Sequence, residues 1–119
     1  MPFYLHQVTY TPEALARLIA NPQDRFEAVR APIEKLGGKI LSSYFAFGQY
    51  DAVVITEMPN NVAAAAIALA FSAGGSLRNA QTTALMSAAE GLEAFRKAAT
   101  CGYKPVAAAA SAAAATPNT

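Results

Sequence analysis

The chain has 119 residues, a formal net charge of +1 and 14% charged residues. This length fits one domain with a modest hydrophobic core, and the near-neutral balance excludes the strongly basic surface of a typical nucleic-acid-binding domain. So few charges also indicate that the fold buries more surface than one small copy can bury alone. We therefore expect a homo-oligomer, a dimer at minimum.

The sequence shows neither the pattern of a secretory signal nor that of a membrane-spanning helix. Cys101 is the single cysteine, which excludes an intrachain disulfide and is typical of a reducing compartment. Residues 1–4 lack the basic segment and apolar run of a secretory signal. The longest apolar run, 62–71, is about half the length that a bilayer requires. We expect a cytoplasmic protein with neither membrane nor nucleic-acid partners.

The first third of the chain predicts a strand and then an interrupted helix. Residues 3–10 alternate in the manner of a strand. Thr11 and Pro12 follow as an N-cap and a first helical residue, so a helix is expected to begin at Pro12 and to run to Ala20. An Asn-Pro pair interrupts the helical pattern, which resumes over 23–36 and ends at a Gly-Gly pair.

A hairpin is expected next. Residues 39–47 and 52–58 are rich in β-branched and aromatic residues and flank the sequence Gly-Gln-Tyr-Asp. Gly48 is expected to adopt the positive φ of a tight reversal. Tyr50 and Asp51 have two interpretations: they shape the turn, or they line a binding site at the end of the sheet.

The last part of the chain predicts two more helices around a fourth strand. A helix with an asparagine N-cap is expected over 62–73, a strand over 76–86, and a helix over 87–99 that opens with a capping box. We expect residues 1–100 to form the folded domain. Residues 101–119 are rich in alanine without a large apolar stripe, which predicts a disordered tail.

This order of elements, βαββαβ, predicts an α+β, ferredoxin-like fold. Its four-stranded antiparallel sheet carries helices on one face, and a C-terminal helix follows. The other face of the sheet would be too apolar to remain in water, so a partner sheet is expected to cover it. The residues expected on this open face are Tyr4, His6, Val8, Tyr44, Val54 and Thr56.

Several short runs are similar to those of the GYD domain family. They are Tyr10-Thr-Pro-Glu13, Arg25 with Val29-Arg30, Lys35-Leu-Gly-Gly38, Gly48-Gln49-Tyr50-Asp51 and Pro59. The resemblance covers roughly residues 1 to 98. It implies a ferredoxin-like fold related to the dimeric α/β barrel proteins, and it implies no particular activity.

Two positions depart from the family pattern. Gln49 stands where a basic residue is common, and Ala14 stands where glycine is common. If the basic residue of the family contacts an anion, the resemblance implies that this chain lacks that contact.

His6 is the single histidine and the candidate catalytic residue. One interpretation is a packed, hydrogen-bonded histidine; the other is a general base or ligand-binding group whose pKa is lowered by burial. The candidate ligand-binding residues are Tyr4, His6, Tyr44, Tyr50 and Asp51. Neither a second histidine nor a cysteine pair accompanies His6, so we expect no metal and no redox cofactor.

Three functions remain open. The first is a homo-oligomeric small-molecule-binding domain with its pocket at the open face of the sheet. The second is a cofactor-free enzyme of the oxygenase or isomerase type, which would use His6 with tyrosines and is supported only by analogy of fold. The third is a structural assembly subunit. A cavity beside His6 would distinguish the first two from the third.

Overall fold

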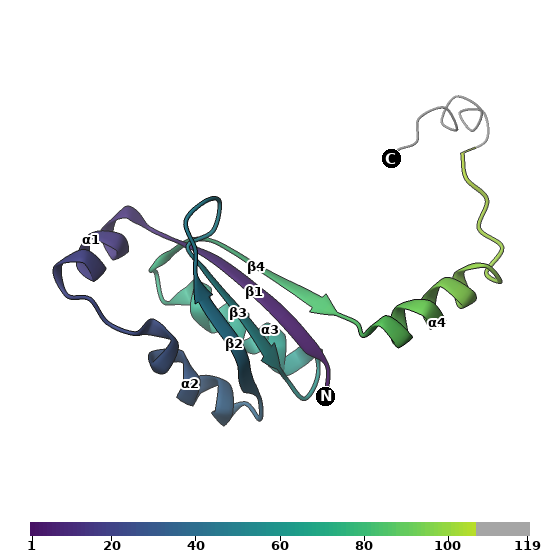
Figure 1. Ribbon diagram of the computed structural model, residues 1–119, viewed down its shortest axis with the longest axis horizontal. Coiled ribbons are helices and arrows are strands. Elements are labelled where there is room, and N and C mark those ends of the chain that lie inside the picture. Colours follow the sequence, from purple (N-terminus) through teal and green to yellow (C-terminus); the bar gives the residue numbers. More distant parts are fainter. Residues whose placement is uncertain (107–119) are drawn as a thin grey trace. The chain divides into compact units, whose positions relative to one another are not determined.

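The computed structural model of the protein describes residues 1–106. Its centre is a four-stranded antiparallel sheet in the order β2-β3-β1-β4 (Figure 1). The strands are β1 (Phe3–Tyr10), β2 (Lys39–Phe45), β3 (Ala52–Glu57) and β4 (Leu77–Leu85). The helices are α1 (Pro12–Ala20), α2 (Arg25–Lys35), α3 (Asn61–Ala73) and α4 (Ala88–Ala98). The expected α+β class with a ferredoxin-like order of elements is confirmed.

The chain divides into two compact units. The first, Met1–Met86, contains the whole sheet with α1, α2 and α3, and the second begins at Ser87 and contains α4. The segment expected to form a disordered tail lies, from residue 107 on, outside the described residues. Within residues 1–106, none of the helices has the length and apolar character needed to cross a membrane.

N-cap residues set where α1 and α2 begin. The Thr11 hydroxyl accepts a hydrogen bond from the Ala14 amide at 3.1 Å, with Pro12 as the first residue of α1. The Asp24 carboxylate then accepts from the Phe26 amide at 2.9 Å, so α2 begins at Arg25, two residues later than expected. The expected interruption thus separates two helices, each with its own N-cap.

The unit that begins at Ser87 also has a defined N-cap. The Ser87 hydroxyl accepts from the Glu90 amide while the Glu90 carboxylate accepts from the Ser87 amide, so the expected capping box is confirmed. The pair satisfies two amides that the first turn of a helix otherwise leaves unpaired.

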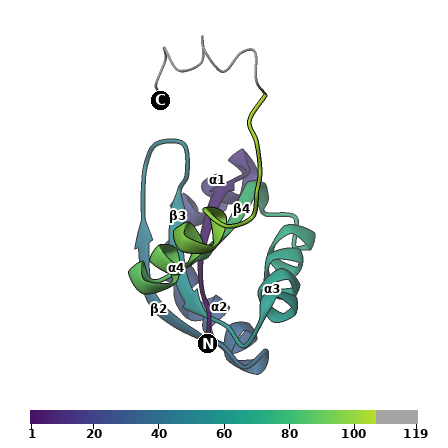
Figure 2. The ribbon, with the colours of Figure 1, turned by 90° about the vertical axis from the view of Figure 1, so that its right-hand side faces the viewer.

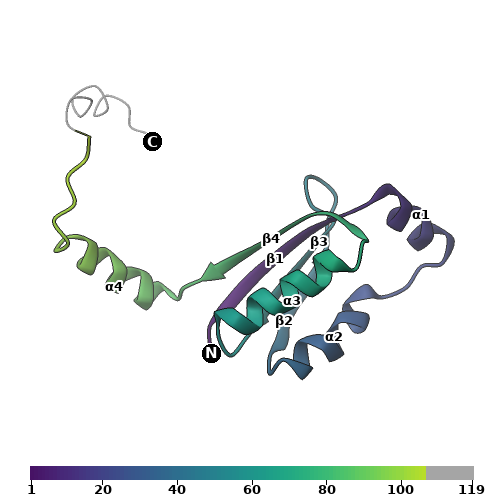
Figure 3. The same cartoon turned by 180° about the vertical axis from the view of Figure 1, so that it is seen from behind.

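Helices α2 and α3 cover the sheet face that carries the even-numbered residues of β1. Tyr4 packs in a core with Ile33 of α2 and with Ala64 and Ile67 of α3. The His6 ring meets the Phe71 ring of α3 edge-on, with 6.4 Å between ring centroids. Figure 3 shows α2 and α3 in front of this face, and Figure 2 shows α3 beside β4.

The assignment of residues to the open face was therefore largely wrong. Tyr4 and His6 are each 3% exposed, and they lie beneath the helices. Val8, Val54 and Thr56 share their face, because Val54 pairs with His6, Thr56 pairs with Tyr4, and Val8 alternates with both. The alternation of β1 placed Tyr4, His6 and Val8 on one face correctly. Alternation alone cannot tell which face of the sheet the helices cover.

Tyr44 is the one member of that set on the open face. It pairs with Val53, which in turn pairs with Gln7. A register shift in β2 between Ile40 and Ser42 sets this pairing. None of α1, α2 and α3 packs on this face, which Figure 1 presents to the viewer.

Gly37 and Gly48 differ in backbone conformation. Gly37 ends α2 with φ +88°, as expected for a helix terminator. Gly48 is not among the glycines of residues 1–106 that have positive φ, so the expectation for the hairpin turn was wrong. The six-residue connection reverses with a hydrogen bond of 2.8 Å from the Ala46 amide to the Asp51 carbonyl instead.

Gly38 is required by close packing. A Cβ atom there would lie 2.7 Å from the Glu57 carbonyl oxygen and would also meet the Met58 sulfur. We expect Gly38→Ala to lower the free energy of unfolding by about 1–3 kcal/mol, the usual cost of overpacking, in urea denaturation. Gly48→Ala is the matched control, because a Cβ at Gly48 meets nothing within 4 Å. It should change stability by less than about 0.5 kcal/mol, and equal effects of the two substitutions would contradict the packing explanation.

Candidate functional site

His6 is held between the two strands that flank β1. Its Nε2 lies 2.9 Å from the Thr56 hydroxyl oxygen of β3, and its Nδ1 lies 3.0 Å from the Thr82 hydroxyl oxygen of β4. A neutral imidazole offers one donor and one acceptor, and a hydroxyl can serve as either. Both ring nitrogens of His6 are therefore satisfied by the protein.

Burial makes His6 a neutral residue near pH 7. Loss of hydration lowers the pKa of its imidazole below the ordinary value of 6.5, in the direction expected from the sequence. A neutral imidazole can in principle accept a proton, but here both nitrogens are already hydrogen-bonded. A substrate would have to displace a threonine hydroxyl before His6 could act as a base.

A half-open cavity of about 710 Å³ lies between the helix-covered face of the sheet and α1, α2 and α3. His6 forms part of its wall. Most of the lining is apolar and comes from β1, β3 and the three helices. The larger apolar residues are Val8, Leu18, Phe26, Val29, Val54, Ile67, Phe71 and Leu77.

Polar groups are few in this cavity and come mainly from the α1–α2 region. Among the described residues that line it, Arg17 and Arg25 are the charged ones, and no carboxylate is among them. Tyr10 lines the same region. Burial raises the pKa of its phenol; the charge of Arg25 lowers this pKa to a smaller extent, and the charge of Asp51 raises it. The remaining polar lining residues are His6, Asn21, Gln23 and Ser76.

The Gly-Gln-Tyr-Asp turn is tied to the sheet by its own hydrogen bonds. The Asp51 carboxylate accepts from the Tyr10 amide at 2.9 Å, and the Asp51 amide donates to the Val8 carbonyl at 2.8 Å. The Thr9 hydroxyl donates to the Gln49 carbonyl at 2.8 Å. These contacts fasten the β2–β3 connection to the end of β1.

Tyr50 links the same β2–β3 connection to β4. Its hydroxyl donates to the Gln81 side-chain carbonyl at 2.6 Å. Gln81 pairs with Gln7, so it belongs to the open face of the sheet. The contacts of Tyr50 and Asp51 thus agree with the turn-shaping interpretation, and neither residue lines the large cavity.

The five candidate ligand-binding residues are not brought to one place. Tyr4 and His6 share the helix-covered face, but the Tyr4 hydroxyl donates to Asn61 and Tyr4 does not line the cavity. Tyr44 lies on the opposite face, with 65% of its surface exposed. Asp51 lines a separate, smaller hollow of about 390 Å³.

Arg17 was not among the residues expected at a site. Tyr10 and Arg25 were noted only as parts of the family pattern, and Arg25 was interpreted as a solvated helix residue. The sequence contained one indication that these residues could meet. Arg17 and Leu18 precede the Asn-Pro interruption of the helical pattern, and Arg25 and Phe26 follow it. A chain that turns between two helices can place such residues together. Within residues 1–106, no group of three His, Cys, Asp or Glu residues is placed to hold a metal ion.

The family model of the GYD domain matches residues 4–95. The chain belongs to the GYD domain family. The resemblance inferred from its short motifs is thereby confirmed. Residues of the candidate cavity, from His6 to Leu77, all fall within the matched range.

Comparison with solved structures finds a similarity to a protein described as "crystal structure of FFRP-DM1". The two chains are 13% identical, with a TM-score of 0.46, and the match covers 72% of this chain and 100% of the other. No curated protein matches the GYD-domain chain.

The depressed pKa of His6 predicts a pH dependence of stability. The unfolded chain binds a proton to His6 near pH 6.5, whereas the folded chain binds it only at lower pH. The stabilisation from neutral His6 is therefore complete above pH 6.5 and is lost as the pH falls through the folded pKa. In urea denaturation, we expect the free energy of unfolding to fall between about pH 6.5 and pH 5, since ordinary carboxyl groups titrate mainly below that range.

His6→Gln provides the control for this measurement. Glutamine retains one donor and one acceptor for Thr56 and Thr82 but has no titrating group in this range. The variant should show a flatter dependence between the same two pH values. Equal slopes for the two proteins would mean that His6 is not the group responsible.

Proposed function

We propose that this GYD-domain chain is a homo-oligomeric protein that binds a small, largely apolar molecule in the cavity between its sheet and its helices. The volume of about 710 Å³ falls within the range of about 300–1,000 Å³ that is usual for small-molecule sites. Apolar walls with a few polar groups are also typical of such sites. The proposed pocket lies on the helix-covered face, not at the open face where the sequence analysis had placed it.

Each part of the cavity has a physical role in this proposal. Val54 of β3 and Phe71 of α3 offer apolar surface to the body of a ligand. His6 adds a neutral aromatic ring beside Phe71. Burial of apolar ligand surface against these residues supplies most of the binding free energy.

The hydrogen bonds of His6 favour binding over catalysis. A cofactor-free enzyme of the expected kind would need His6 to accept or donate a proton. Thr56 and Thr82 occupy both of its nitrogens. A half-open apolar hollow with a few polar groups is typical of a small-molecule site, and a purely structural subunit does not require one.

The open face of the sheet supports self-association. Leu5, Val53 and Ile55 are half-buried on this face, where Phe3 is 44% exposed and Tyr44 is 65% exposed. A contiguous apolar surface of this kind is commonly a protein–protein interface. A second copy of the chain would cover it with an identical surface, as in a two-fold dimer.

The first test of the binding proposal is to fill the cavity. Ala70 of α3 is an exposed residue that lines the cavity, so Ala70→Trp places a large ring in it without removing a core contact. We expect the affinity for N-phenyl-1-naphthylamine, a neutral apolar fluorophore, to fall at least about tenfold, equivalent to about 1.4 kcal/mol. A fluorescence titration measures this affinity.

Ala65→Trp is the matched control on the same helix. Ala65 is also exposed, but it does not line the cavity. This variant should bind the fluorophore as the unmodified protein does. A cavity that takes up no fluorophore, or equal losses in both variants, would contradict the proposed pocket.

A second test concerns self-association. Tyr44→Asp introduces a charge into the open face, and burying that charge without a partner costs several kcal/mol, on the order of the stability of a typical interface or domain. Since Tyr44 is exposed within one copy, the variant should fold but have half the mass of the unmodified protein, or less, in light scattering at micromolar concentration.

Leu69→Asp serves as the control for that experiment. Leu69 is 69% exposed and lies on α3, on the other side of the sheet. It should leave the mass of the assembly unchanged. An unmodified protein that is already monomeric, or a Tyr44→Asp variant that keeps its partner, would refute self-association through the open face.

A further inference from the structure

We propose that the ligand of the cavity is an organic monoanion, with an apolar or aromatic body and one carboxylate that is held by Arg17 and Arg25. This inference rests on the proposed small-molecule-binding function and names the chemical class of the ligand. Arg17 lies in the last turn of α1, and Arg25 is the first residue of α2. The short connection between the two helices brings both into the lining of one cavity.

The two arginines are charged groups that the described protein does not neutralise. Within residues 1–106, the ion pairs are formed by the Met1 amino group and by Arg30, Lys39 and Lys97, and none involves Arg17 or Arg25. Arg25 donates one long hydrogen bond, 3.3 Å, to the neutral side chain of Gln23. Guanidinium groups beside apolar walls and without a carboxylate partner attract an anion.

The carboxylates of the surrounding elements have other partners or lie outside the cavity. Asp24 caps α2 through the Phe26 amide. Asp51 accepts from the Tyr10 amide and lines the smaller neighbouring hollow. Glu13 lies in the first turn of α1, one turn before Arg17, and does not line the cavity. The lining of the cavity therefore carries a local excess of positive charge.

A neutral polar residue close to Arg25 also suits this ligand. Tyr10 lines the cavity and is close enough to Arg25 to feel its charge. Burial raises the pKa of the Tyr10 phenol, so the hydroxyl stays protonated at neutral pH and remains a donor. A carboxylate accepts from a phenol as well as from the paired N–H groups of a guanidinium.

The distribution of the lining residues gives the ligand a direction. The charged groups come from α1 and from the start of α2, whereas Ile67 and Phe71 come from α3. Figures 1 and 3 show α1 at one end of the sheet, with α3 lying along it. The carboxylate of the ligand would lie toward α1, and its apolar body would lie against α3 and His6.

The test compares a carboxylate with its neutral isostere. N-phenyl-1-naphthylamine reports occupancy of the cavity, and 2-naphthoate and 2-naphthamide compete with it. In the unmodified protein we expect 2-naphthoate to displace the fluorophore at a concentration about tenfold lower than 2-naphthamide does, equivalent to about 1.4 kcal/mol. The preference should shrink as salt is added, because the arginines are partly exposed.

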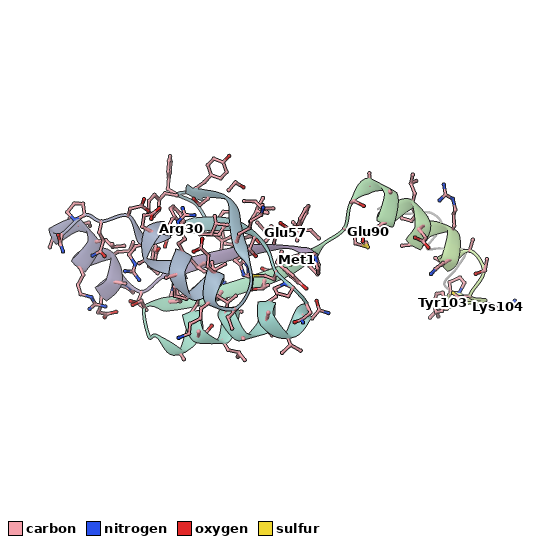
Figure 4. The ribbon with its side chains drawn as sticks, turned by 90° about the horizontal axis from the view of Figure 1, so that it is seen from below. Met1, Arg30, Glu57, Glu90, Tyr103 and Lys104 are labelled. Carbon is pink, nitrogen blue, oxygen red and sulfur yellow. The ribbon has the colours of Figure 1, made fainter. Side chains whose placement is uncertain are left out.

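Substitution of the arginines locates the effect. Arg17→Gln and Arg25→Gln should each reduce the preference for 2-naphthoate, and the double variant should abolish it. The preference is the ratio of the two displacing concentrations within one variant, so a change in fluorophore affinity affects both competitors equally and cancels. Arg30→Gln is the matched control. Arg30, labelled in Figure 4, lies on α2. It donates to Glu27 at 3.0 Å and does not line the cavity. Arg30→Gln should keep the full preference.

The outcomes separate the ligand class from the proposed function. A fluorophore that binds, with equal displacement by 2-naphthoate and 2-naphthamide, would overturn the anion proposal and leave the binding function in place. A preference that survives in the double variant would overturn the role of the two arginines. If the fluorophore itself does not bind, the pocket and its ligand class both fail.

Discussion

The central position of β1 is the constraint on which the rest of the structure depends. This strand pairs with β3 on one side and with β4 on the other, so its alternation sets the composition of both faces of the sheet. His6 lies on the helix-covered face and bonds to a threonine from each neighbour. A buried imidazole with both nitrogens satisfied fixes the three strands in one register, because a shift by one residue would leave it without partners.

The cavity follows from how the helices attach to this sheet. Tyr4, Ile33 and Ile67 form a core at one end, where α2 and α3 both reach the sheet. Farther along, the alanine-rich face of α3 contributes little volume, and Ala70 with Ala28 of α2 lines the space that remains. Larger side chains at these positions would close the space. The small residues are therefore as important to the candidate site as its polar groups.

Local signals in the sequence predicted most of the fold. The caps at Thr11 and Ser87 and the terminator at Gly37 each depend on hydrogen bonds or backbone angles within a few residues, and each was confirmed. The side of the sheet on which His6 lies depends on packing between distant elements, and it was assigned wrongly. Arg17 and Arg25 were not predicted as site residues for the same reason, since only the tertiary fold brings them to one cavity.

The hydrogen bonds of His6 also bear on the order in which the protein can fold during synthesis. His6 and Thr56 are 50 positions apart in the chain, and His6 and Thr82 are 76 positions apart. During synthesis β1 therefore leaves the ribosome before the other three strands of this sheet, yet it gains its second neighbour only when β4 has been made. Contacts so distant in sequence slow folding, because a long loop must close, with a loss of chain entropy, before these contacts can stabilise the fold. Until β4 is made, one edge of β1 remains unpaired, and that nascent edge is open to pairing with other chains.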